Sequence, residues 1–222
     1  MDIQEFKNIW QAYDDKLEKS LKLNMHCLEL IQSQKAKSKL KTLFISRIIE
    51  ITLHAVVIWY LGTFLYSHFF EPQYAISAAI LILFFIIAFS NCIRQIVIIK
   101  EIDYSKSITE IQRKLTLLQS HIADYIRLTF LMLPTYLAYP IIAFKVLGNF
   151  DIVSQLSRNW WTAQIIFNIV LIPLCVWLYR EVSYKNLHKK WVRYVIEKSA
   201  GDSVAKAMEF IKEIDEYKKE VI

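Results

Sequence analysis

Glycine, proline and cysteine are scarce in this chain. Its 222 residues include three Gly, four Pro and three Cys. A β-rich fold depends on many tight turns, which Gly and Pro supply, so this composition argues against one. The cysteines at positions 27, 92 and 175 form no CxxC pair, which argues against both a disulfide framework and a zinc site. The composition therefore favours a helical protein.

Signatures of catalysis are missing as well. The sequence holds no HExxH, no GxSxG, no P-loop and no GxGxxG. Three glycines also leave few positions for the close backbone turns on which such motifs depend. We therefore expect a protein that is not an enzyme and that has no catalytic residues, no cofactor-binding residues and no metal site.

Apolar residues make up 55% of the chain and gather in four long runs. The runs cover residues 48–70, 74–93, 128–147 and 160–179. About 20 helical residues cross a ~30 Å hydrocarbon core, and all four runs reach that length. The second and fourth carry no charge, whereas an amphipathic helix of a soluble bundle would show a polar stripe. The sequence predicts an all-α integral membrane protein with four transmembrane helices.

The remaining segments are charged and helical in pattern. Residues 1–42 predict an amphipathic helix with a polybasic end, residues 94–127 a helical hairpin between the second and third spans, and residues 181–222 a helical tail. The four-helix membrane domain then covers residues 43–180. These three segments are the expected helical extensions outside the bilayer.

Basic residues are distributed very unevenly among the loops. Of the 27 Lys and Arg, only Lys145 and Arg158 fall on the side of the two short loops near residues 71–73 and 148–159. The positive-inside rule therefore places both termini and the central hairpin in the cytoplasm, and we expect a multi-pass protein of the cell inner (cytoplasmic) membrane. This bias also accounts for the net charge of +6 without a nucleic-acid partner.

The N-terminal helix carries a heptad seam. Asn24 occupies one core position, which in coiled coils fixes register at some cost in stability. The seam consists of Ile3, Phe6, Trp10, Tyr13, Leu17, Asn24 and Ile31. Two interpretations stay open: the helix packs on its own chain or on another copy, or it binds a helix of a different cytoplasmic protein. The following KAKSKLK run at 35–41 sets the topology or attracts anionic membrane lipid.

The central hairpin has recognisable local signals. Residues 103–105 read as a turn, and Ser107 with Glu110 forms the S-x-x-E pattern that starts a helix. Apolar residues then recur at 3–4 spacing from Ile108 to Tyr125. This stripe needs a cover, and the N-terminal helix is the expected one.

Arg47, Glu50 and His54 share one face of the first span, at spacings of three, four and seven residues. Ionisable groups inside a membrane are costly, so they suggest a proton or cation relay. The simpler interpretation is a self-satisfied cluster in which Arg47 reaches the interface, Glu50 pairs with it and neutral His54 bonds a neighbouring helix. We favour the second interpretation.

Two segments carry a family resemblance, WQAYDDKLEKSLKLN at 10–24 and PTYLAYPIIAF at 134–144. With the topology above, the chain resembles small polytopic, four-span membrane proteins of Bacteroidota-type bacteria. The resemblance implies an association with extracytoplasmic-function sigma factors, and hence a membrane-tethered regulator such as an anti-sigma factor. The HxxxCxxC signature of zinc-type anti-sigma factors is absent here, and the resemblance transfers no functional residue.

The sequence thus predicts a non-enzymatic, membrane-anchored interaction or regulatory protein that acts through its cytoplasmic helices. The alternative is a small oligomeric channel or transporter that uses Glu50 and His54. Pro134 and Pro140 in the third span predict a kink, and transporters bind ligands at such breaks, although kinks are also common without one.

Overall fold

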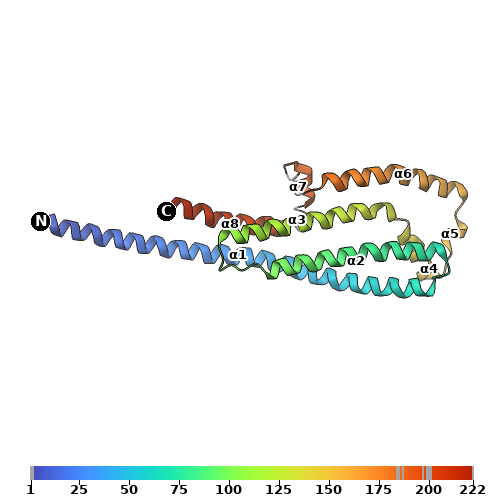
Figure 1. Ribbon diagram of the computed structural model, residues 1–222, viewed down its shortest axis with the longest axis horizontal. Helices are drawn as coiled ribbons and strands as arrows, with labels where there is room; N and C mark the ends of the chain where they lie inside the picture. Colours follow the sequence, from blue (N-terminus) through green and yellow to red (C-terminus); the bar gives the residue numbers. More distant parts are fainter. Residues whose placement is uncertain (1–2, 184–185, 187, 197, 199–201, 222) are drawn as a thin grey trace.

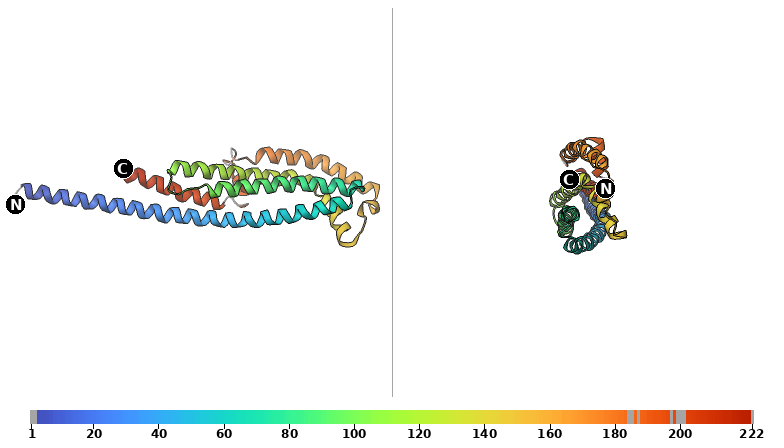
Figure 2. Two further views of the ribbon diagram at one scale, coloured as in Figure 1. Left: turned by 60° about the horizontal axis from the view of Figure 1, so that its bottom comes forward. Right: turned by 90° about the vertical axis from the view of Figure 1, so that its right-hand side faces the viewer.

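The computed structural model describes residues 3–183, 186, 188–196, 198 and 202–221, and their regular secondary structure is helical throughout (Figure 1). The helices are α1 (Ile3–Ser67), α2 (Pro72–Lys100), α3 (Ile108–Met132), η1 (Leu133–Thr135), α4 (Ala138–Gly148), α5 (Ile152–Gln155), α6 (Arg158–Glu181), α7 (Lys190–Ile196) and α8 (Asp202–Val221). They form an elongated bundle with α4 and α5 at one end and the N-terminus at the other (Figures 1 and 2). The expected all-α class is confirmed.

Helix α1 is a single rod of 65 residues, on the order of 100 Å long at ~1.5 Å per residue. It contains no proline, and its one glycine, Gly62, lies near its end. Nothing in the sequence therefore interrupts the helix until the turn before Pro72, which occupies the first turn of α2. The N-terminal amphipathic segment, the polybasic run and the first apolar run consequently share one axis.

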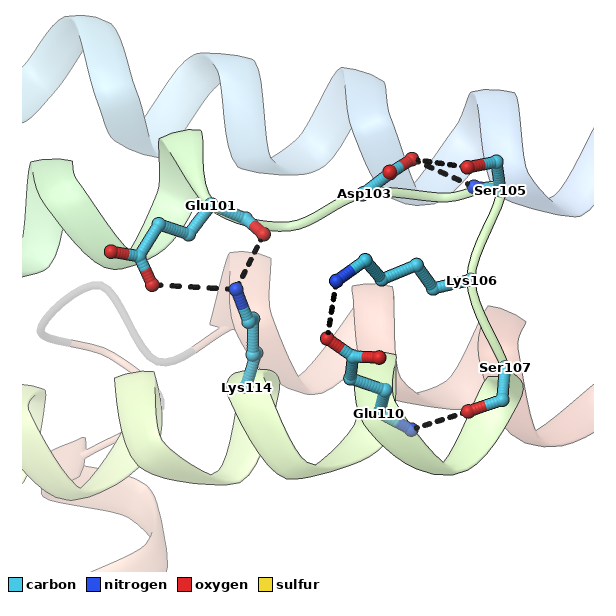
Figure 3. Close-up of polar contacts among 7 residues, drawn as sticks. All are labelled: Glu101, Asp103, Ser105, Lys106, Ser107, Glu110 and Lys114. Atoms are coloured by element: carbon cyan, nitrogen blue, oxygen red, sulfur yellow. Dashed lines mark hydrogen bonds and ion pairs between the residues drawn. The ribbon is translucent and has the colours of Figure 1, made fainter.

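Side-chain hydrogen bonds and ion pairs hold the turn between α2 and α3 (Figure 3). The Asp103 carboxylate accepts hydrogen bonds from the Ser105 amide at 3.0 Å and from the Ser105 hydroxyl at 2.7 Å. Ser107 caps α3, because its hydroxyl accepts from the Glu110 amide at 3.4 Å. Lys114 donates to the Glu101 carbonyl at 2.6 Å. The predicted turn and helix start are confirmed.

The third apolar run is not one straight helix. The chain breaks at η1, and α4 leaves at an angle of 67° to the α3–η1 helix. Pro134 lies in η1 and Pro140 in the first turn of α4, and neither residue has an amide hydrogen for the helical ladder. In the described chain three helices, in α1, α2 and α6, are long and apolar enough to cross a membrane, or four if the bent pair counts as one span.

Two apolar cores hold the bundle together. The first, which we call the basic-end core, joins α1, α2, α3, α7 and α8 through residues that include Leu40, Ile98, Leu115, Val192 and Ile211. The second lies at the opposite end, where α1, α2 and α4 meet, and includes residues such as Phe64, Ala78 and Ile142. Between and around these cores, α1, α2 and α6 expose many large apolar side chains, as lipid-facing helices do.

The cover of the α3 stripe agrees only in part with the sequence-based expectation. The structure places α8 against it, with Val204, Ala207 and Ile211 fully buried. Helix α1 contributes Ala36 and Leu40, from the end of the predicted N-terminal helix of residues 1–42, and Leu43 just beyond it. The reason is register: the stripe lies beside the middle of α1, so the first turns of α1 extend past the bundle (Figure 2).

Candidate functional site

Arg47 and Glu50 of α1 form an ion pair that is buried at its Arg47 end. Their spacing of one helical turn brings the two side chains together, and the Arg47 Nη1 donates to the Glu50 Oε2. The Arg47 side chain is 1% exposed, whereas the Glu50 side chain is 32% exposed. The guanidinium is thus the deeply enclosed partner, and the carboxylate is the one that reaches the surface of the bundle.

Two further helices complete this cluster. From α2, the Cys92 thiol donates to the Glu50 Oε2 at 3.6 Å. From α3, the Tyr125 ring lies 5.0 Å from the Arg47 Cζ, a cation–π distance. The pair therefore lies where α1, α2 and α3 meet, at the membrane end of the basic-end core. Sequence spacing could not reveal Cys92 or Tyr125, because it reports neighbours along one helix only.

His54 is buried one turn further along α1 and is not joined to the pair. Its ring packs at a tilt against Phe85 of α2, with centroids 5.6 Å apart and planes at 56°. Among the described atoms its Nδ1 has no hydrogen-bond partner, and no hydrogen bond links it to Glu50. The structure brings Arg47 and Glu50 together as predicted but leaves His54 in an apolar contact.

The contacts of this cluster join helices α1, α2 and α3, which fits a structural role. A guanidinium keeps its charge at any working pH, so Arg47 cannot pass a proton. About one turn away on α2 and α3, the Gln95 amide nitrogen donates to the His121 carbonyl at 3.5 Å, which links those two helices directly. Among the described residues, no three His, Cys, Asp or Glu side chains are grouped so as to hold a metal ion.

The N-terminal part of the predicted seam lies on the length of α1 that extends past the bundle (Figure 2), whereas its last residue, Ile31, adjoins the stretch of α1 that packs against α8. Trp10, Tyr13, Leu17 and Ile31 are 58%, 70%, 60% and 53% exposed, and Asn24 is exposed too. The side chains of the other two seam residues, Ile3 and Phe6, lie outside the described part of the chain. A neighbouring face of α1 is covered by α8, where Gln32 hydrogen-bonds Glu213.

The far side of the same helix is charged. Glu18 and Lys22 form an ion pair at 2.6 Å with both side chains well exposed. Helix α1 thus presents an apolar, aromatic face and a charged face along the length that projects from the bundle.

Comparison with protein-family models, with curated proteins and with solved structures found no match for this chain.

Proposed function

We propose that this protein is a non-enzymatic membrane anchor whose projecting N-terminal helix binds another cytoplasmic protein. The observation that carries the proposal is the exposed seam of Trp10, Tyr13 and Leu17 on a helix that extends past its own bundle. Exposing three large apolar side chains on one helix face to water is energetically unfavourable. An amphipathic helix of this kind fits an apolar groove on a partner or the seam of a second helix.

The residue types support binding rather than solvation. Trp and Tyr are enriched at interaction hot spots, where truncation of a single side chain costs about 2 kcal/mol or more. The charged face with Glu18 and Lys22 remains available to water. In this proposal the partner therefore covers one side of α1 only.

The orientation of the protein follows from its charges. Both ends of the chain and the α2–α3 turn lie at the basic end, and among the Lys and Arg residues that the structure describes only Lys145 and Arg158 lie at the opposite end. Under the positive-inside rule we place the basic end in the cytoplasm and the chain in the inner membrane. The projecting helix would then face cytoplasmic proteins, which agrees with the regulatory, anti-sigma-like role that the family resemblance implies.

Site-specific photo-crosslinking in living cells tests this function. A photoreactive amino acid at Tyr13 or Leu17 of the full-length chain should yield a discrete crosslinked product. The matched controls are Asp15 and Lys19, which lie on the charged side of the same turns and should yield none. Equal products from both faces, or none from the seam, would contradict the proposal.

The alternative function, a small oligomeric channel or transporter, makes a different prediction. Ion flux through proteoliposomes of the wild-type chain that falls in both Glu50→Gln and His54→Ala would favour it over the anchor. The described contacts give it little support, because Glu50 is tied to Arg47 and His54 faces Phe85.

A further inference from the structure

A groove of about 450 Å³ lies where α1 passes the end of α2 and the following turn. Its floor is apolar, with Leu40 and Phe44 from α1 and Ile99 and Ile102 from the α2 side. Its remaining walls are polar: they consist of Lys37, Lys41, Lys100, Asp103, Tyr104 and Ser105. The groove thus combines an apolar base with a basic rim.

The three lysines of the rim are exposed, and in the described structure none forms an ion pair. Lys100 is held over the Phe44 ring, with its Nζ 5.7 Å from the ring centroid.

The carboxylates at the groove already have partners on this chain. Asp103, the carboxylate that lines it, accepts from the Ser105 amide and hydroxyl (Figure 3). Nearby, the Glu101 carboxylate pairs with Lys114 at 3.3 Å. The lining holds three ammonium groups, those of Lys37, Lys41 and Lys100, against the single carboxylate of Asp103, so the groove is net positive.

The groove lies at the outer edge of a lipid headgroup layer, and the side chain of Lys37 starts one turn further out than that of Lys41. Lys41 precedes the first apolar run by seven residues and Lys100 follows the second by seven, which is about 10 Å along each helix. A headgroup region adds roughly 5–8 Å on each side of the hydrocarbon core, and lysine stems extend their charge toward it. Exposed Ile45 and Val97 lie on the membrane side of the same two segments.

We propose that this groove is a binding site for one anionic phospholipid. The phosphate would lie between the ammonium groups of Lys37, Lys41 and Lys100. The glycerol and the first carbons of an acyl chain would cover Leu40 and Phe44. This inference goes beyond the protein-binding function and does not depend on it, because the groove and the seam occupy different stretches of α1.

Lipid binding to the full-length chain tests the site. In detergent, native mass spectrometry counts bound phosphatidylglycerol against phosphatidylcholine. A cation near a lipid surface contributes ~1 kcal/mol, so each lysine-to-glutamine change in Lys37→Gln and Lys41→Gln should weaken phosphatidylglycerol binding about fivefold. Phosphatidylcholine binding should not change. These side chains are exposed, so the fold should tolerate both substitutions.

Lys39→Gln is the matched control. It removes the same charge from the same helix at the same depth, but Lys39 does not line the groove. Its phosphatidylglycerol binding should equal that of the wild type. Equal weakening by Lys39→Gln would mean that general surface charge attracts the lipid, and equal binding of both lipids would mean that no anionic site exists. Displacement of the lipid by millimolar inorganic phosphate would assign the groove to a soluble phosphate, and would also overturn the proposal.

Discussion

Replacing Glu50 should destabilise the protein more than replacing Arg47, although the two form one ion pair. Arg47 is 1% exposed and Glu50 is 32% exposed. Removing one partner of a buried pair costs about 3–5 kcal/mol, because the other charge is left uncompensated. For Glu50→Gln we expect about 3 kcal/mol, at the lower end because the carboxylate is partly exposed. The remaining guanidinium cannot lose its charge.

Arg47→Met should cost less than half as much. The carboxylate that it leaves behind is 32% exposed, so it is less costly to leave without a partner than the enclosed guanidinium, and the main further loss is the contact with the Tyr125 ring. The double variant Arg47→Met/Glu50→Leu should be no less stable than Arg47→Met alone, because neither charge then remains. Such a result would be a strongly non-additive cycle, as expected for two groups in direct contact.

The assay is reversible unfolding of the full-length chain in mixed detergent micelles, followed by helical circular dichroism. Glu18→Gln is the control, since it breaks an exposed pair on the same helix and should change stability by less than about 0.5 kcal/mol. Equal costs for Glu50→Gln and Glu18→Gln would refute the structural role of the cluster, and so would additive costs in the double variant.

Three further predictions concern other parts of the fold. The Tyr74 hydroxyl donates to Asp151 at 2.9 Å and holds the pKa of that carboxyl below its ordinary value. The stabilisation from this bond is present at neutral pH and is lost as the pH falls through the folded-state pKa. Tyr74→Phe should therefore raise the pKa of Asp151, seen by carboxyl-carbon NMR, and an unchanged titration would contradict this contact. Ser107→Ala removes the cap of α3 and should lower the free energy of unfolding by about 1 kcal/mol. Ser107→Asp should restore most of that loss. An unchanged free energy of unfolding in the alanine variant would mean that the cap does not contribute to stability. Ile211 is fully buried, so Ile211→Ala should cost about 2–5 kcal/mol and make α8 cleavable at lower protease concentration, whereas an unchanged digestion pattern would place α8 elsewhere.

Local features of this fold were predictable because short-range rules determine them. The Ser107 cap depends on a residue three positions away, and the Arg47–Glu50 pair on a residue one turn away. Likewise the uncharged runs in α2 and α6 follow from composition alone. Each of these needs no knowledge of how one helix is rotated against another.

Contacts between helices were not predictable in this way. Cys92 and Tyr125 reach the ion pair only because of the register in which α2 and α3 lie beside α1. The same register decides that α8 joins α1 in covering the α3 stripe. Prolines at 134 and 140 indicated a kink in the third run, but its 67° angle depends on the packing of α4 against α1 and α2.

Cysteine accessibility in intact cells tests the central claim of a membrane-embedded bundle with its basic end inside. Cys27 is exposed at the basic end, whereas Cys92 and Cys175 are buried, so the wild-type chain carries its own reporter. A membrane-impermeant maleimide should label Cys27 only after the inner membrane is breached. In a Cys27→Ser background, Gln155→Cys should be labelled in cells whose inner membrane is intact. The reverse pattern, or labelling of both positions without a breach, would contradict the account.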